Sequence, residues 1–90
     1  MIKVNIADSE HDALLNIRAA KIYHEITGHD MSKMGEVTDA GAFIYACIEA
    51  AYRWKKSPNP ITLDDVYDRV ELSEMATILL QLLPQKKEGE

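Results

Sequence analysis

Residues 38–55 read TDAGAFIYACIEAAYRWK, the most apolar helical pattern in the chain. Phe43 and Cys47 recur at helical spacing on one stripe, and further apolar side chains lie beside that stripe. Thr38 or Asp39 is the expected N-cap, because short polar side chains accept hydrogen bonds from the first helical N–H groups. Since so little of this helix is polar, we expect it to occupy the centre of the fold.

Upstream of it, another helix is expected over residues 9–27. Ser9 is a favourable N-cap, and Asp12 follows three residues later, close to a capping-box arrangement. Gly28 is the expected stop, because glycine adopts the left-handed C′ conformation without a Cβ penalty. Residues 29–38 are then a connector with room for one short helical turn.

A short strand is expected at the N-terminus, where Ile2, Val4 and Ile6 alternate with polar residues. No second strand is evident in the sequence, and the backbone groups of a lone strand need a partner. Two arrangements are open at this point: the strand lies on a helix of its own chain, or it pairs with another copy.

Downstream, two prolines follow the central helix and end it, because proline cannot continue a helix. Thr62 and Asp65 then have the spacing of a capping box, which predicts a helix over residues 63–70. A last helix is expected over residues 74–83 and ends before Pro84.

The 90 residues suffice for one domain. We expect a mainly α-helical domain of about four helices with a short N-terminal β-strand over residues 1–84, followed by a flexible tail over residues 85–90.

The net charge of −5 argues against a sequence-independent grip on nucleic acid. No apolar run approaches the ~18 residues that span a bilayer, and the first residues lack a signal-peptide layout, so we expect a cytoplasmic protein.

Few residues have the type and spacing that catalysis or metal binding requires. Cys47 lies among apolar residues, which favours a small buried hydrophobe over a nucleophile. His24, His29 and Asp30 lack the spacing of a metal site and are better read as exposed residues at a helix end. The acidic residues of segment 64–71 suit a solvated helix face better than a divalent-ion site. We therefore expect no enzyme activity, no cofactor and no metal.

One basic cluster contains Arg53, Lys55 and Lys56, with Trp54 inside it. An aromatic ring among cations can stack on nucleic-acid bases. The alternative is a helix end whose cations face the negative end of the helix dipole while Trp54 points into the core. We favour this alternative and expect no nucleic-acid partner.

The last predicted helix carries apolar residues at nearly every position around its axis, more than one face can hold. Such a helix is either clamped between others within one monomer or partly exposed. In a chain this small some of these residues are expected at the surface, where a contiguous apolar patch usually marks an interaction site. The candidate partner-binding residues are the leucines of this helix and the adaptable methionines of the connector: Leu79, Leu80, Leu82, Leu83, Met31 and Met34.

Three motifs occur in a particular order along the chain. The first helix ends in YHEITGHDM (residues 23–31), a Thr-Gly followed by a polar pair and a hydrophobe. The central helix contains FIYACI (residues 43–48), and the next begins with ITLDDV (residues 61–66). In their order and spacing, over roughly residues 2–83, these segments resemble the small tail assembly chaperones of long-tailed bacteriophages.

The resemblance implies a non-enzymatic protein that binds the tape measure protein, keeps its apolar helices soluble and helps to recruit tail tube subunits. It implies action in the cytoplasm of the bacterial host and absence from the mature virion. We also expect a homo-oligomer and no membrane partner. No residue of the family has a catalytic role that could be carried over.

A different class of function is the alternative: a small acidic helical adaptor or regulatory protein of a prophage, acting as a homodimer on a protein partner. A chaperone should solubilise a long helical client, whereas a regulator should bind one folded partner. A small enzyme or metal protein is the least favoured interpretation.

Overall fold

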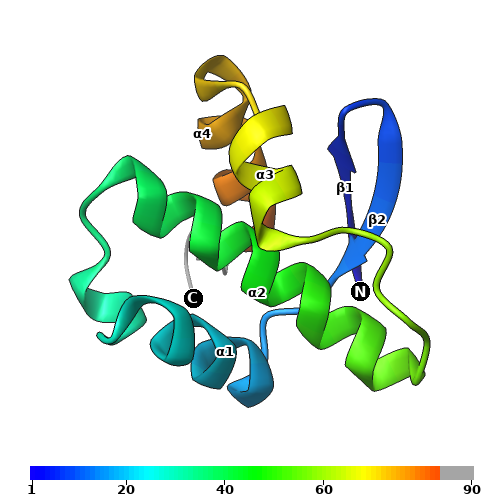
Figure 1. Ribbon diagram of the computed structural model, residues 1–90, viewed down its shortest axis with the longest axis horizontal. Coiled ribbons are helices and arrows are strands. Elements are labelled where there is room, and N and C mark those ends of the chain that lie inside the picture. Colours follow the sequence, from blue (N-terminus) through cyan, green and yellow to red (C-terminus); the bar gives the residue numbers. More distant parts are fainter. Residues whose placement is uncertain (84–90) are drawn as a thin grey trace, which may run out of the picture.

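The computed structural model describes residues 1–83, which form an antiparallel hairpin and four α-helices (Figure 1). The elements are β1 Ile2–Ile6, β2 Ser9–Ala13, α1 Ile17–Thr27, the 3-10 turn η1 Met31–Lys33, α2 Val37–Lys55, α3 Leu63–Arg69 and α4 Leu72–Leu82. The expected fold class, mainly helical with a short N-terminal strand, is therefore confirmed. The predicted tail at residues 85–90 and the end of the domain at residue 84 lie outside the described residues.

The hairpin corrects the predicted start of the first helix. Residues 9–13, expected to be helical, form β2 and pair with β1 in a register that places Val4 opposite His11. The two-residue turn between the strands holds Ala7 and Asp8 at φ 50° and 68°, the left-handed backbone that a tight hairpin needs. The strand β1 therefore pairs with β2 of its own chain, which follows it directly in the sequence, and it also packs against α4.

The first helix begins only after the hairpin. The Asn16 side chain caps α1 by accepting a hydrogen bond of 3.0 Å from the Ala19 N–H. Its end agrees with the prediction, because Gly28 follows the helix with φ 81°.

The turn residues of the hairpin give a stability prediction. Replacing Ala7 by Asn and Asp8 by Gly should stabilise the protein by about 1 kcal/mol, because residues with a Cβ pay a penalty at positive φ that Gly avoids and Asn reduces. The midpoint of urea unfolding should rise while the slope of the transition stays constant. An unchanged or lower midpoint would contradict the turn geometry.

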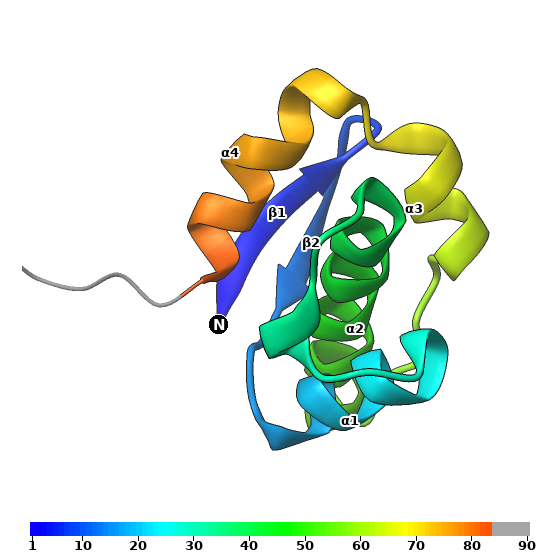
Figure 2. The same cartoon turned by 90° about the vertical axis from the view of Figure 1, so that its left-hand side faces the viewer.

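The centre of the fold is α2, as expected from its apolar sequence. Figure 2 shows α1 below it, with the hairpin, α3 and α4 around its other sides. Nine of its residues are buried, Phe43, Ile44 and Ile48 among them. The hairpin is tied to this helix by a hydrogen bond of 2.9 Å from the Leu14 N–H to the Cys47 carbonyl.

The ends of α2 differ from expectation in two respects. Glu36 is the N-cap and Asp39 the third helical residue of a capping box, so neither Thr38 nor Asp39 is itself the cap. At the other end Trp54 is 69% exposed, so the prediction that it points into the core is wrong. Trp54 lies in the last turn of α2, before the left-handed Lys56 that ends the helix.

The last two helices begin close to their predicted positions. The Thr62 hydroxyl accepts from the Asp65 N–H at 3.1 Å, and the Asp65 carboxylate accepts from the Thr62 N–H at 3.0 Å, which confirms the capping box. The helix α3 ends at Arg69, one residue before the predicted end. The helix α4 begins at Leu72, two residues earlier than predicted, and Leu83 is its C-cap.

Candidate functional site

The surface around α4 is the candidate partner-binding site. This helix packs against α2 and β1, which buries Ile78 and Leu82 and leaves Leu82 only 2% exposed. Leu80 and Leu83 lie on the outside, with 64% and 41% of their surface exposed. Leu79 is half-buried against the core. The structure therefore divides the four predicted leucines: Leu82 belongs to the core, and Leu80 and Leu83 to the surface.

An apolar hollow of about 450 Å³ opens at the C-terminal end of α4. The hollow lies where this end of the helix meets the beginning of β1 and the residues after β2. Its walls are apolar apart from one glutamine side chain: Met1, Ile2, Ala13, Leu14, Leu15, Gln81, Leu82 and Leu83. Because Met1 and Leu83 are themselves 53% and 41% exposed, apolar surface continues from the hollow onto α4.

A second hollow, of about 160 Å³, lies at the N-terminal end of α4, between α2 and α3. Apolar residues again dominate its lining: Val37, Thr38, Gly41, Ile44, Val66, Tyr67, Val70, Leu72 and Met75. The Tyr67 ring packs so close to Gly41 that a Cβ there would lie 2.9 Å from a ring carbon. Gly41 therefore allows the close approach of α3 to α2 that forms this wall of the hollow.

The methionines of the connector occupy a different place. Met31 and Met34 are half-buried, and both pack against the core beside the end of α1. Neither lines the two hollows next to α4. The structure thus does not gather the six predicted partner-binding residues on one surface.

Three exposed residues beside α4 were not among the partner-binding residues predicted from the sequence. Leu72 is 70% exposed, Val37 is 54% exposed and Tyr67 is 43% exposed, and all three line the smaller hollow. The sequence does carry a signal for Leu72: no proline separates its segment from the α3 pattern, so a helix that includes Leu72 could have been expected there. Val37 and Tyr67 carry no local signal, since their exposure depends on how α2 and α3 pack.

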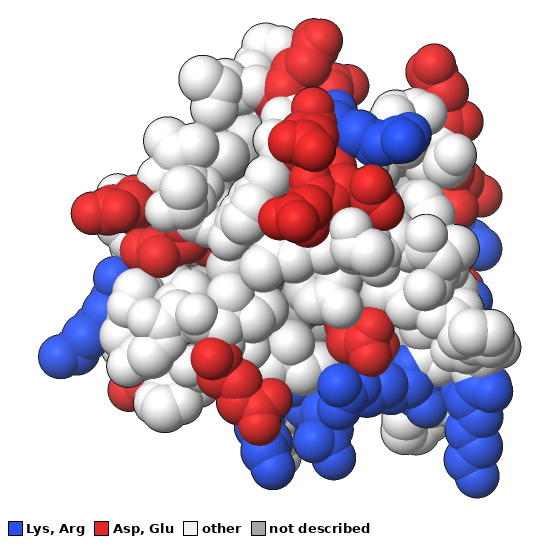
Figure 3. Space-filling view, in the orientation of Figure 1, with Lys and Arg blue, Asp and Glu red and all other residues white. Residues whose placement is uncertain are grey.

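Charged side chains are distributed unevenly over the molecule (Figure 3). At the hairpin, Asp12 pairs with Lys3 and with Lys55, both at 2.7 Å. Hydrogen bonds from these two lysines lower the pKa of Asp12 to about 2. These pairs connect β1, β2 and the end of α2.

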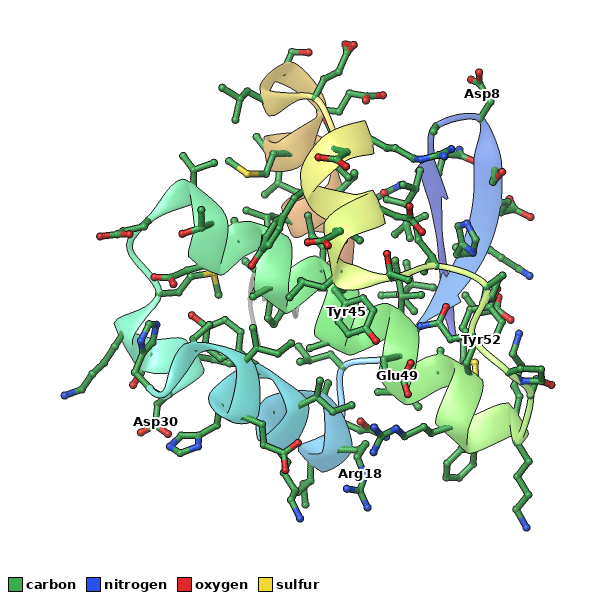
Figure 4. All side chains as sticks on the ribbon, viewed as in Figure 1. Asp8, Arg18, Asp30, Tyr45, Glu49 and Tyr52 are labelled. Atoms are coloured by element: carbon green, nitrogen blue, oxygen red, sulfur yellow. The ribbon has the colours of Figure 1, made fainter. Side chains whose placement is uncertain are left out.

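A second polar cluster forms around Glu49 on α2, beside Tyr45 (Figure 4). Arg53 Nε donates to its carboxylate at 2.7 Å, and Asn59 Nδ2 donates at 2.8 Å. Burial alone would raise the pKa of Glu49, but these hydrogen bonds outweigh burial and the pKa is lowered. Asn59 also accepts from the Ile61 N–H at 2.9 Å, so the cluster fastens the α2–α3 loop to α2.

His29, which the sequence analysis did not favour as a metal ligand, takes part in a structural contact. Its Nε2 lies 3.0 Å from the Tyr23 hydroxyl and 3.3 Å from Asp39 Oδ2. Tyr23 is fully buried, so the contact links the core side of α1 to the start of α2. Within residues 1–83 no group of three or more His, Cys, Asp or Glu side chains is placed to hold a metal ion.

Cys47 is buried, and burial raises the pKa of its thiol to about 12. A thiol with so high a pKa is protonated at neutral pH and is a poor nucleophile. This environment supports the interpretation of Cys47 as a small buried hydrophobe.

His11 gives a pH-dependence prediction. It is buried against Tyr52, and burial, aided by the charge of Lys55, lowers its pKa below 6.5. The imidazole of His11 therefore binds a proton more readily in the unfolded chain than in the folded protein. Its contribution to stability is present above about pH 6.5 and is lost as the pH falls through the folded-state pKa. Urea unfolding at pH 7.5 and pH 5.5 should show a smaller pH dependence in His11→Gln than in the wild type. Equal pH dependence would contradict this role of His11.

No helix within the described part of the chain combines the length and apolar character needed to cross a membrane.

Comparison with protein-family models, curated proteins and solved structures finds no match. The functional argument therefore depends on the surface and on the sequence resemblance described above.

Proposed function

We propose that this protein is a non-enzymatic tail assembly chaperone of a phage or prophage, which binds the tape measure protein through the surface around α4. The observation that carries the proposal is the apolar surface formed by Leu80 and Leu83, with an apolar hollow at each end of the helix. Contiguous exposed apolar surface of this kind is typical of interaction sites. The order of sequence motifs supports the choice of client.

An exposed apolar surface suits the task of keeping a helical client soluble. A long helical client exposes apolar side chains before it is assembled, and these aggregate unless they are covered. Leu80 and Leu83 offer a ridge against which such side chains can be buried, and the hollows can accept individual side chains of the client. The net charge of −5 would keep the complex soluble.

On this proposal the protein acts in the cytoplasm of the bacterial host, helps to bring tail tube subunits to the client and leaves before the virion is complete. Its role is to bind and release, without chemistry on the client.

Co-expression tests the proposal. The tape measure protein encoded in the same genome is produced with and without this chain, and the soluble fractions and tag pull-downs are compared. A soluble complex, with the tape measure protein insoluble when produced alone, is the expected result. An insoluble client and no co-purification would contradict the chaperone function and favour the prophage adaptor.

A further inference from the structure

A further hollow, of about 280 Å³, lies between the hairpin and α3. The strand β2 contributes Ser9 and His11 to its lining, and α3 contributes Asp65 and Arg69. It shares no lining residue with the two hollows next to α4. The hollow is therefore separate from the surface of the proposed function, and what it binds does not depend on that function.

His11 is the most deeply placed polar side chain of this lining, with only 9% of its surface exposed. Its Nδ1 atom lies 3.1 Å from the hydroxyl of Tyr52, on the part of α2 beside the hairpin (Figure 4). Its Nε2 atom has no hydrogen-bond partner within residues 1–83, yet no fully buried side-chain nitrogen or oxygen of these residues lacks one. Nε2 is therefore accessible, and the hollow that His11 lines gives a ligand access to it.

Arg69 and Asp65 present opposite charges to the same hollow. Arg69 Nε and Asp65 Oδ1 are 3.8 Å apart, which is too far for a hydrogen bond, and the Arg69 side chain is 60% exposed. Asp65 is ionised at neutral pH, because the hydrogen bond from the Thr62 N–H, aided by the charge of Arg69, lowers its pKa. A cation and an anion thus remain available to one ligand.

The apolar part of the lining is small. Ile6 and Ile61 are buried, so each offers little area to a ligand, whereas Pro60 is exposed. Ser9 is exposed as well, and its hydroxyl makes no hydrogen bond within the described part of the chain. The hollow therefore suits a small ligand that is mainly polar and carries a short aliphatic group.

We propose that this hollow binds a free α-amino acid with a short aliphatic side chain, such as valine. The carboxylate of the amino acid would pair with Arg69, its ammonium group with Asp65, and its side chain would lie against Pro60. The amine nitrogen and the carboxyl carbon of an amino acid lie about 2.5 Å apart. The two charges of the ligand can therefore face the Asp65–Arg69 pair in the opposite order.

The uncharged groups of the lining also fit a ligand that both donates and accepts hydrogen bonds. If His11 Nε2 carries no proton it accepts from the ammonium group, and if it carries one it donates to the carboxylate. The Ser9 hydroxyl can likewise donate to the carboxylate. A zwitterion thus satisfies His11 in either neutral tautomer.

Ligands with a single charge fit this lining less well. A simple carboxylate would bind Arg69 but would meet the like charge of Asp65, and a simple amine would meet the like charge of Arg69. A divalent cation is disfavoured for the same reason as the amine. Two analogues of valine, 3-methylbutanoate without the amine and 2-methylpropylamine without the carboxylate, therefore test which charges the hollow requires.

An NMR titration of the full chain with L-valine tests the proposal. Valine should shift the backbone amide signals of Ser9, His11, Asp65 and Arg69, with a dissociation constant on the order of 1 mM, as suits a ligand this small. Each analogue should bind at least about tenfold more weakly. The absence of shifts with valine, shifts confined to the hollows next to α4, or equally tight binding of 3-methylbutanoate would overturn the proposal.

Arg69→Met removes the guanidinium group but keeps the apolar part of the side chain. The fold should persist, because Arg69 is exposed and makes no hydrogen bond with Asp65. Valine should bind this variant at least about tenfold more weakly. Arg18→Met, on α1 and outside the lining, is the matched control and should bind valine like the wild type. Unchanged binding in Arg69→Met, or equal losses in the two variants, would overturn the proposal.

Asp65→Asn tests the opposite charge. The asparagine side chain can still accept from the Thr62 N–H, so the start of α3 should persist, and circular dichroism checks the fold of all three variants. Valine should bind more weakly than to the wild type, whereas 3-methylbutanoate should bind more tightly, because the like charge has been removed. The same preference for valine over 3-methylbutanoate as in the wild type would overturn the assignment of the ammonium group to Asp65.

Discussion

Replacing Leu80 and Leu83 together by serine should abolish stable binding of the tape measure client while leaving helical content unchanged. Both side chains are exposed, and Leu83 follows the last residue of α4, so the fold loses little. Each leucine that a client would bury contributes about 1.5–3 kcal/mol, so removal of both should weaken binding on the order of 100-fold or more. Tag pull-down and a binding titration with a soluble client segment measure the effect.

Ile17→Ser is the matched control for this pair. It also removes an exposed aliphatic side chain, one at the start of α1 that is 89% exposed and lies outside both hollows next to α4. Client binding should be unchanged in this variant. Equal losses in the control and in the leucine pair would show that general surface hydrophobicity, and not α4, binds the client.

Replacing Leu82 by alanine should lower the free energy of unfolding by about 3 kcal/mol. Leu82 is 2% exposed and belongs to the core cluster, so truncation removes buried methyl groups and leaves a cavity. The loss is a large share of the ~5–13 kcal/mol expected for a domain of this size. Urea unfolding followed by circular dichroism measures it.

Leu80→Ala, two residues away on the same helix, should change the free energy of unfolding by less than about 0.5 kcal/mol, because Leu80 is 64% exposed. A similar cost for the two truncations would mean that α4 packs differently from the arrangement described here. The two leucines thus separate a stability effect from a binding effect within one turn of helix.

Local chemistry accounts for the parts of the fold that the sequence predicts. The Thr62–Asp65 capping box and the Gly28 stop use short-range hydrogen bonds and backbone preferences, so they can be read without knowledge of the tertiary structure. The central position of α2 follows from its almost continuous apolar character. These features are the reason that the fold class could be predicted.

The hairpin could not be predicted because its turn lacks the usual residues. Type I′ turns favour Asn-Gly, whereas this turn has Ala7 and Asp8, and Ser9 followed by Asp12 imitates a helix start. The second strand has no regular apolar alternation: only His11 and Ala13 are buried in it. Pairing with β1 therefore decides its conformation, and local propensity does not.

The candidate site was predictable only in part, because exposure depends on packing. The pattern of α4 identifies too many apolar residues for one face but does not distinguish Leu82 from Leu80. That difference arises from the contacts of α4 with α2 and β1, which are distant in sequence. The exposure of Trp54 depends on packing in the same way, because no element within the described residues covers its position in the last turn of α2.

Amide hydrogen exchange tests the central claim, that the surface around α4 binds the client. Exchange is measured on the free chain and on its complex with the tape measure protein. The account predicts added protection in α4 and in the segments that line its two hollows, residues 1–2, 13–15, 37–44 and 66–75, with little change in α1. Protection confined to α1 or to the hairpin turn, with exchange in α4 unchanged, would contradict it.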